Sequence, residues 1–409
     1  MNGLVFGLGI VLFALGICLS VALHEAGHMV SAKSFGMKVR RYFIGFGPRI
    51  WSFRRGETEY GLKAIPLGGF CDIAGMTAMD EVTPAEAPRA MWRFAAWKRI
   101  IVMSAGSITH FILGFIILYL VAVGWGLPNY QERPIVGATD CAAATQDAKT
   151  FKLSECGPGD PSPARAAGIQ ANDEILSVNG QSTTTWTDLV TKVRDLRGPS
   201  TFVLRRDGVE RTITVDIETV KRVAIGSVRG KDGNQVVDVG AIGIAPNPYV
   251  EYGGLAAVGG TINFTGQMFA KTWEGLMAFP KKIPKVVEAI GGGERDPDTP
   301  VSVVGASVLG GDAVQHGLWD FVLLLLASLN FFVGVFNLLP LLPLDGGHIA
   351  VTIYEKVRDW LRKLRGRPAG GPVDYTRLTA VTMVVVFIGG AVVLLTVTAD
   401  LVNPLRIPQ

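Results

Sequence analysis

Residues 3–28 read GLVFGLGIVLFALGICLSVALHEAGH, an apolar run that passes directly into two histidines and a glutamate. From Gly3 to Leu23 the run contains no Asp, Glu, Lys or Arg. As a helix rising about 1.5 Å per residue, it can cross the roughly 30 Å hydrocarbon core of a bilayer. It has neither the basic segment nor the small-x-small cleavage site of a signal peptide, so we expect a permanent membrane helix.

Three further stretches are long and free of charged side chains: 100–127, 321–344 and 378–399. Of the 409 residues, 18% are charged, whereas soluble domains carry about 25%. The sequence therefore predicts an α-helical polytopic membrane protein with four transmembrane helices. A fifth uncharged stretch, 253–270, contains five glycines and several polar residues. We expect it to lie outside the membrane or at its surface.

Two loops between predicted spans are rich in basic residues. Residues 24–99 contain twelve Lys and Arg, and residues 345–377 contain seven. Cytoplasmic loops of membrane proteins carry such an excess, so both loops are expected in the cytoplasm. Both chain ends and the long segment 128–320 are then expected outside. We interpret the basic runs as topology signals, and no nucleic-acid partner is expected, because the net charge of +4 is small.

The outer segment begins with a pattern typical of a small α+β module. Residues 162–180, SPARAAGIQANDEILSVNG, resemble the signature of a bacterial PDZ domain, and alternating strands flank Asp207-Gly208, a hairpin signal. We assign 128–220 to an extracytoplasmic PDZ domain. Such domains bind peptides by adding a strand to a sheet edge, although a β-domain without a peptide ligand remains an alternative. Residues 221–320 are expected to form a linker, either plain or an amphipathic hinge.

The four cysteines divide between the two sides of the membrane. Cys18 lies in the first span and Cys71 in a cytoplasmic loop, where thiols stay reduced. Cys141 and Cys156 lie in the outer segment. In an oxidising compartment these two could form a disulfide, or they could remain free thiols.

The candidate chemistry lies where the first span meets the cytoplasm. His24 and His28 are one helical turn apart, so both imidazoles can bind one Zn²⁺, and Glu25 lies beside them, where it can take a proton from water. A catalytic zinc usually has three protein ligands. The best third candidate is Asp345 in NLLPLLPLDGG, residues 337–347, because spans one and three run in the same direction and end at similar depth. Alternatively, Asp345 is a turn residue before Gly-Gly.

Together these motifs resemble the site-2 protease family of zinc intramembrane metalloproteases, in particular its RseP-like branch with a single PDZ domain, as in actinobacterial members. The resemblance covers nearly the whole chain. It implies one zinc ion per chain, held by His24, His28 and Asp345, with Glu25 as the catalytic acid and base. It also places Asn337 and Pro340 near the substrate. Residues 105–107 are similar to a family motif in span two, where this chain has Ser107 and His110 in place of the usual Pro and Asn.

Residues 40–70, within the loop 39–70, are similar to the membrane-associated β-hairpin of these enzymes. We expect a turn at 55–58, with Trp51 and Phe53 alternating on one strand and Tyr60 and Leu62 on the next. An edge strand beside the active site could hold an extended substrate, or the hairpin could only anchor the loop. The residues expected to contact substrate are Gly45, Phe46, Gly47, Gly68 and Gly69.

The resemblance implies an endopeptidase that cleaves transmembrane segments of single-span proteins such as anti-sigma factors. A site-1-type protease would first trim the substrate ectodomain, and the PDZ domain would act as a size filter or bind a peptide or ectodomain. The expected location is the bacterial plasma membrane, in contact with its lipid, with span pairs at 1–127 and 321–409 and the active site near the cytoplasm. Two other classes remain open: a serine intramembrane protease using Ser107 or Ser307 with His110, and a non-proteolytic PDZ scaffold.

Overall fold

A computed structural model describes residues 2–76, 80–228, 233–293, 295–296, 298–371 and 373–407. The chain divides into two compact units, one formed by residues 1–124 and 254–409 and the other by residues 125–253. Each unit is described by itself. Residues 229–232, 294 and 297 of the predicted linker 221–320 lie outside the described residues.

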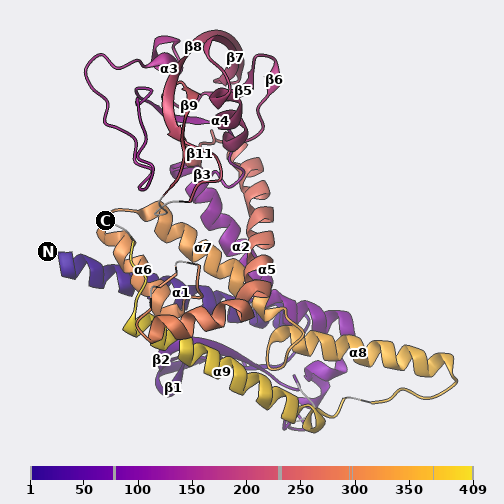
Figure 1. The fold of residues 1–409 in the computed structure, drawn as a ribbon. Coiled ribbons are helices and arrows are strands. Elements are labelled where there is room, and N and C mark those ends of the chain that lie inside the picture. The colour runs from indigo at the N-terminus through magenta and orange to yellow at the C-terminus, as the bar shows by residue number, and fades with distance from the viewer. Residues whose placement is uncertain are drawn as a thin grey trace. The chain divides into compact units, whose positions relative to one another are not determined.

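Among the described residues, four helices of the first unit are long and apolar enough to cross a bilayer. They are α1 (Asn2–Ser34), α2 (Ala96–Gly124), α7 (Trp319–Asn337) and α9 (Thr379–Val402) (Figure 1). All four predicted spans are thus helices. The first helix continues past Leu23 to Ser34, so HEAGH lies inside it rather than at its end. The third ends at Asn337, because the prolines that follow cannot continue a helix.

Two more helices of the first unit occupy the region expected to be a linker. The 35-residue helix α5 (Ala256–Ile290) packs with Phe269 against Phe111 of α2 and Phe331 of α7. The helix α6 (Val303–Gln315) packs closely on α1, where a Cβ added to Gly9 would lie 2.9 Å from the Gly311 Cα. Gly310 and Gly311 of α6 therefore permit close packing on α1, and two helices in this region mean that it is no plain linker.

The predicted hairpin consists of β1 (Val39–Arg55) and β2 (Thr58–Ile73), joined at Gly56-Glu57. Trp51 pairs with Leu62 and Phe53 with Tyr60, which confirms the predicted alternation. However, residues 42–44 of β1 pair with residues 60–62 of β2 on one side and with residues 69–71 of β2 on the other. Each strand is therefore bent back on itself. Four segments therefore lie in the order 69–73, 39–44, 58–62 and 51–55. Among the described residues, no other strand pairs with 69–73.

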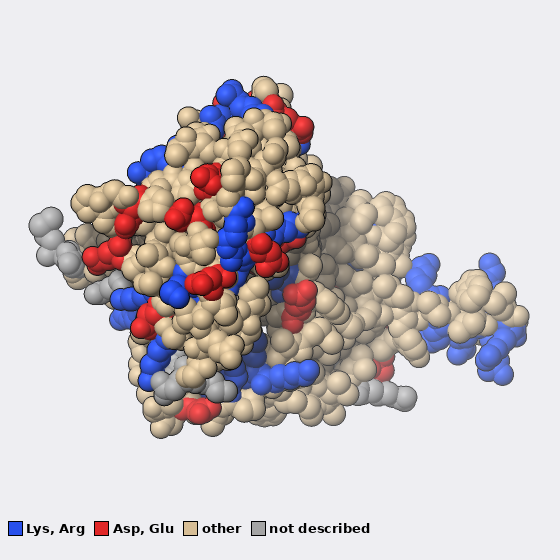
Figure 2. All heavy atoms as spheres, turned by 45° about the horizontal axis from the view of Figure 1, so that its top comes forward, with Lys and Arg blue, Asp and Glu red and all other residues tan. Residues whose placement is uncertain are grey.

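The helix α8 (Asp345–Leu364) begins after a loop of residues 338–344, and the turns η1 (Ala87–Arg89) and η2 (Met91–Arg93) precede α2. A third turn, η3 (Tyr375–Arg377), leads into α9. The first half of α8 is fixed to α2 by an ion pair of 2.9 Å between Arg99 and Glu355. Its second half carries exposed basic side chains, which Figure 2 shows as a blue group at the right of the view.

The second unit is built on a five-stranded sheet in the order β6-β5-β7-β8-β9. Phe202, Leu204, Ile175 and Leu189 are fully buried at its core. The predicted short helix, strand, helix and hairpin of this region are present. The unit extends to Gly253, past the predicted boundary at 220, because later strands pair back onto earlier ones. The elements are β3 (Leu127–Pro128), β4 (Val136–Thr139), α3 (Pro163–Ala166), β5 (Glu174–Val178), β6 (Gln181–Ser182), α4 (Trp186–Arg194), β7 (Gly198–Arg206), β8 (Val209–Val223), β9 (Val236–Ala241), β10 (Ile244–Pro246) and β11 (Tyr249–Val250).

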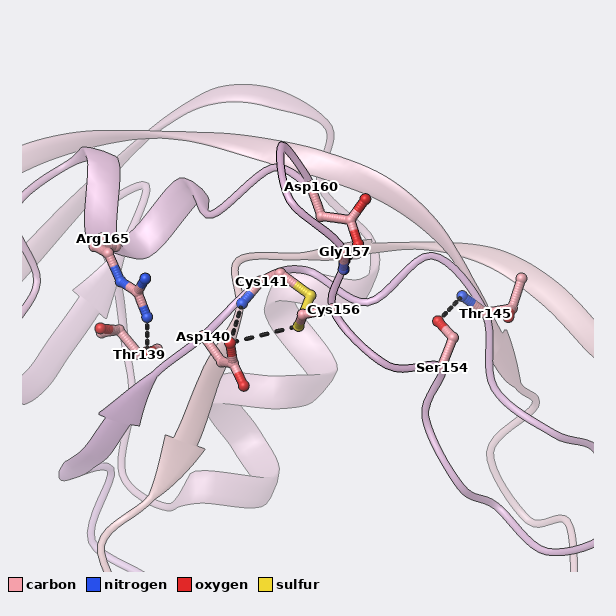
Figure 3. The surroundings of a disulfide bond; sticks show 9 residues. All are labelled: Thr139, Asp140, Cys141, Thr145, Ser154, Cys156, Gly157, Asp160 and Arg165. Atoms are coloured by element: carbon pink, nitrogen blue, oxygen red, sulfur yellow. Dashed lines mark hydrogen bonds between the residues drawn. A yellow bond between two sulfur atoms is a disulfide. The ribbon is translucent and has the colours of Figure 1, made fainter.

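A disulfide closes a loop of the second unit. Cys141 and Cys156 are bonded, with their Cα atoms 5.9 Å apart (Figure 3). The carboxylate of Asp140 accepts a hydrogen bond of 2.8 Å from the Cys141 backbone N–H beside it. Cys18 and Cys71 are free. Of the two alternatives that the sequence left open for the outer cysteines, the structure contains the disulfide.

Candidate metal centre

Three side chains from the two ends of the chain converge in the first unit. His24 and His28 project from α1, and Asp345 is the first residue of α8. The Asp345 Oδ2 lies 3.3 Å from the Nε2 atom of each histidine, and the two Nε2 atoms are 3.1 Å apart. The three potential ligand atoms therefore lie within 4.8 Å of one another. This is the donor set that a catalytic zinc site uses.

The orientation of the groups fits a metal ion. The Nδ1 of His28 lies 2.7 Å from the Val102 carbonyl oxygen of α2. Because a carbonyl only accepts, the proton is on Nδ1 and the lone pair of Nε2 faces the centre, as in metal-binding histidines. The Asp345 Oδ2 is buried without a hydrogen-bond partner among the described residues. An unsatisfied buried carboxylate oxygen is costly, and a cation between it and the imidazoles would satisfy it.

Two glycines allow α1 and α2 to meet at this centre. A Cβ added to Gly106 of α2 would lie 2.5 Å from His24 Cε1 and from His28 Nε2. A Cβ added to Gly27 of α1 would lie 2.6 Å from the Ala105 carbonyl oxygen. Both distances are shorter than any real contact. The sequence shows Gly106 only as part of a resembling motif, whereas the structure places its Cα hydrogens directly against both imidazoles.

Glu25 lies between the metal centre and the edge of the hairpin. The outer segment of β2 passes beside it: a Cβ added to Gly69 would lie 3.1 Å from the Glu25 Cγ, and the backbone amide of Cys71 interacts with its carboxylate. The segment 69–73 that contacts Glu25 is also the one whose outer side pairs with no other described strand. Backbone groups able to pair with an extended peptide therefore lie next to the candidate acid and base.

The other predicted substrate residues shape the hairpin and the loop before α8. Gly45, Gly47 and Gly68 have φ angles of +89°, +81° and +123°, which other residues adopt at a cost. The ring of Phe46 covers Gly68, since a Cβ there would lie 2.5 Å from it. The remaining two follow the third span: Asn337 ends α7, and Pro340 lies in the loop 338–344.

A buried polar network lies one turn before the centre: His110 is hydrogen-bonded between helices, through Asn330 and Ser20, which the sequence motifs did not single out. The Nδ1 of His110 in α2 is 2.8 Å from the Asn330 Oδ1 of α7. The Asn330 amide nitrogen donates to the Ser20 hydroxyl of α1 at 3.2 Å. The His110 ring also packs 4.9 Å from the His24 ring, centroid to centroid. The sequence signal for this network is the side-chain amide of Asn330 in the middle of an apolar span, because polar groups inside a membrane are rarely left unpaired.

Tyr42 attaches the hairpin to α1 immediately before His24. Its hydroxyl donates to the Ala22 carbonyl oxygen at 2.7 Å. Burial raises the pKa of Tyr42 to about 12, and the Glu25 carboxylate acts in the same direction. The hydroxyl therefore stays protonated and keeps its hydrogen bond at neutral pH.

Among the described residues, His348, Ser107 and Ser307 form no serine–histidine pair. Burial lowers the pKa of His348, whose Nδ1 lies 3.3 Å from the Tyr375 hydroxyl, so it is a neutral residue of α8. Among the described residues, Ser107 Oγ has no hydrogen-bond partner. Ser307 donates to the Val303 carbonyl oxygen of its own helix. His110 is thus paired with an asparagine and not with a serine.

Comparisons with known proteins agree over nearly the whole chain. The family model for peptidase family M50 matches residues 12–380. A zinc metalloprotease Rip1 of Mycolicibacterium smegmatis is 48% identical, over 99% of this chain and 100% of that protein. The zinc metalloprotease Rip1 of Mycobacterium tuberculosis strain H37Rv is 47% identical, with the same coverage. A probable membrane metalloprotease of Arabidopsis thaliana, chloroplastic ARASP2, is 28% identical over 90% of this chain and 75% of its own length.

Proposed function

The chain belongs to peptidase family M50, and we propose that His24, His28 and Asp345 hold its zinc ion and that Glu25 is its catalytic acid and base. The protein is a multi-pass membrane protein and a zinc-dependent intramembrane metalloprotease. Membership of this family excludes the two alternative functions, a serine intramembrane protease and a non-proteolytic PDZ scaffold. One observation carries the residue assignment: three ligand atoms, two from α1 and one from α8, converge within 4.8 Å.

The chain's own residues can divide the work of peptide hydrolysis. When bound, zinc supplies a Lewis acid that activates water and polarises the scissile carbonyl. Val102 holds the His28 ring so that its Nε2 faces the centre. Glu25 takes the proton of the attacking water and returns it to the leaving amine, a role suited to a carboxylate beside the metal ligands.

The free edge of segment 69–73 binds the substrate in this proposal. A transmembrane helix hides its carbonyl groups in its own hydrogen bonds, so it must unwind before hydrolysis. Pairing with Gly69 and Phe70, and with Gly68 directly before them, would compensate the backbone groups that unwinding exposes. Gly69 lies against Glu25, so the paired strand would present its peptide bonds close to the acid and base. Asn337 and Pro340 contribute to the substrate site from the end of the third span.

The second unit acts as a PDZ module in the proposed enzyme. Its sheet, with α3 and α4, fits the predicted signature. The excess of basic residues in 24–99 and 345–377 supports an orientation with these loops in the cytoplasm and the second unit outside. There it would exclude single-span proteins, such as anti-sigma factors, until a site-1-type protease has trimmed their ectodomains. The bacterial plasma membrane is the proposed location.

The assignment is tested with the purified full-length protein and a single-span model substrate in detergent. Because general acid–base catalysis contributes about 100-fold to 10,000-fold, Glu25→Gln is expected to lower cleavage at least about 100-fold while the zinc content stays near one per chain. His24→Ala and Asp345→Ala are expected to lose zinc as well as activity. Zinc is measured by inductively coupled plasma mass spectrometry.

The control variant is Ser107→Ala, which is expected to cleave at the wild-type rate. A chelator should abolish wild-type cleavage, and added zinc should restore it. Wild-type cleavage by Glu25→Gln would refute its role as acid and base, and full zinc occupancy in Asp345→Ala would refute the third ligand.

A further inference from the structure

The helix α8, which begins at the candidate ligand Asp345, has an apolar stripe that no other described part of the chain covers. Ile353, Val357, Trp360 and Leu364 are spaced as i, i+4, i+7 and i+11, so they face one side of the helix. Their side chains are between 48% and 66% exposed, and Tyr354 and Leu361 beside them are also exposed. The opposite side of the helix packs on the rest of the unit, where Thr352 is buried and Glu355 binds Arg99.

Basic residues border the stripe on both sides. At about 100° per residue, Lys356 and Lys363 fall on one flank of the stripe, and Arg358 and Arg365 on the other. Apart from the candidate ligand Asp345, the acidic side chains of the helix are paired, Glu355 with Arg99 and Asp359 with Arg358, so the positive charge of the margins comes mainly from Lys356, Lys363 and Arg365. The outer face of α8 is therefore apolar in the middle and positive at its margins.

The position of α8 in the chain keeps it at one membrane surface. The span α7 ends at Asn337 and the span α9 begins at Thr379, so the segment between them starts and ends at the same face of the bilayer. Arg99, which anchors Glu355, directly precedes the apolar run of α2 that starts at Ile100. Trp97, which is 56% exposed, lies two residues before Arg99. Tryptophan is enriched at the membrane–water interface, so this is the expected level of that interface.

We propose that the outer face of α8 binds the surface of the bilayer, with its stripe in the acyl boundary and its Lys and Arg on anionic phospholipid headgroups. Helices with an apolar face that contains Trp and Leu and with basic margins lie in this manner, because the long basic side chains reach the headgroups while their stems cover apolar surface. Anionic lipid is the occupant that matches both the apolar stripe and the positive margins, and the adjoining spans put α8 within its reach.

Lipid binding by α8 also affects the metal centre. This consequence rests on the proposed function, in which Asp345 is a zinc ligand. The carboxylate is the first residue of the helix, so any tilt of α8 moves it relative to His24 and His28 on α1. A bilayer that holds α8 in its plane therefore also holds the third ligand in place. Anionic lipid is expected to raise protease activity through this helix.

The direct test measures the depth of α8 in nanodiscs. Nitroxide labels are placed at Val357→Cys on the stripe or at Arg362→Cys on the opposite side, in a full-length background with Cys18 and Cys71 replaced by alanine. With phosphatidylcholine and phosphatidylglycerol at 7:3, the label at 357 is expected to be more accessible to oxygen than to a water-soluble nickel reagent, and the label at 362 the reverse. Equal exposure of both labels to the nickel reagent would overturn the proposal.

The charge test uses the triple variant Lys356→Gln, Lys363→Gln and Arg365→Gln. Wild-type cleavage of a model substrate is expected to be at least fivefold faster in anionic than in pure phosphatidylcholine nanodiscs, and the triple variant less than twofold faster. A matched variant that removes three positive charges from the second unit, Lys152→Gln, Arg211→Gln and Lys221→Gln, should respond as the wild type does.

The outcomes separate this inference from the proposed function. If even the wild type cleaves in no lipid but the label at 357 is still more accessible to oxygen than to the nickel reagent in anionic nanodiscs, lipid binding stands and the proposed function fails. If cleavage is normal and neither depth nor rate depends on lipid charge, the lipid proposal fails alone. If cleavage by the triple variant is still accelerated by anionic lipid as wild-type cleavage is, the lipid proposal is also overturned, because α8 would not be the element that responds to lipid.

Discussion

Single residues of the metal centre differ in how far the sequence reveals them. The spacing of His24, Glu25 and His28 indicates one metal ion, and Asp345 was expected beside them because spans one and three run in the same direction, although α1 continues past the histidines to Ser34. Gly106 is different. Gly106 matters because α1 and α2 cross there. The point at which two helices cross depends on how their surfaces pack together, and the sequence of one helix alone does not specify it. Asn330 was predictable in principle, since it is an amide within an apolar span.

Gly106→Ala is expected to disrupt the centre. The added methyl group would lie 2.5 Å from ring atoms of His24 and His28, so α1 and α2 must separate or the rings must turn away. We expect zinc content below half of the wild-type value and cleavage reduced at least about 100-fold, as positional shifts near 1 Å can cause.

The matched control for this substitution is Gly124→Ala at the end of the same helix, where an added Cβ meets no atom within 4 Å. It should retain zinc and activity, because alanine favours helix more than glycine does. Normal zinc content in Gly106→Ala would show that the rings adjust to the methyl group.

At the scale of elements, strands and turns were predicted well and their bending was not. The alternation of Trp51 and Phe53 with Tyr60 and Leu62 predicts a hairpin with the observed register. The return of each strand on itself depends on glycines with positive φ, at Gly45, Gly47 and Gly68, and a glycine in a sequence permits such a bend without requiring it. The helix α5 was missed for a related reason, because the five glycines of 253–270 suggested breaks.

The disulfide is expected to stabilise the second unit mainly by restricting its unfolded chain. For two cysteines separated by 15 residues in sequence, loop-closure entropy predicts about 3 kcal/mol. Replacing both Cys141 and Cys156 by serine should lower the opening free energy of β8 amides by about this amount, measured by hydrogen exchange on the full-length protein. The exposed Glu155→Gln is the control, and an unchanged exchange rate in the double variant would contradict the prediction.

For the whole molecule, the number of spans follows from composition, whereas the division into units does not. Four uncharged stretches correspond to α1, α2, α7 and α9, because twenty apolar residues in succession leave few alternatives to a membrane helix. The extent of the second unit depends on strands after residue 220 that return to pair with earlier ones. Such long-range pairing has no local signal in the sequence.

The proposed orientation predicts which sites a membrane-impermeant maleimide can reach in intact cells. A cysteine introduced at Lys152 should be labelled directly, because the second unit is expected outside. A cysteine at Arg365 should be labelled only after the membrane is permeabilised. Both positions are exposed, so accessibility within the fold is not the difference between them. The opposite pattern would invert the topology and contradict the positive-inside argument.

The separation of the candidate ligands along the chain also affects biosynthesis. His24 and His28 emerge early from the ribosome, whereas Asp345 follows only after three hydrophobic segments have been translated. On the proposed assignment, a partly made chain possesses two of the three groups that bind the ion and is proteolytically inert. On this assignment the enzyme would become competent only after its third hydrophobic segment has been made.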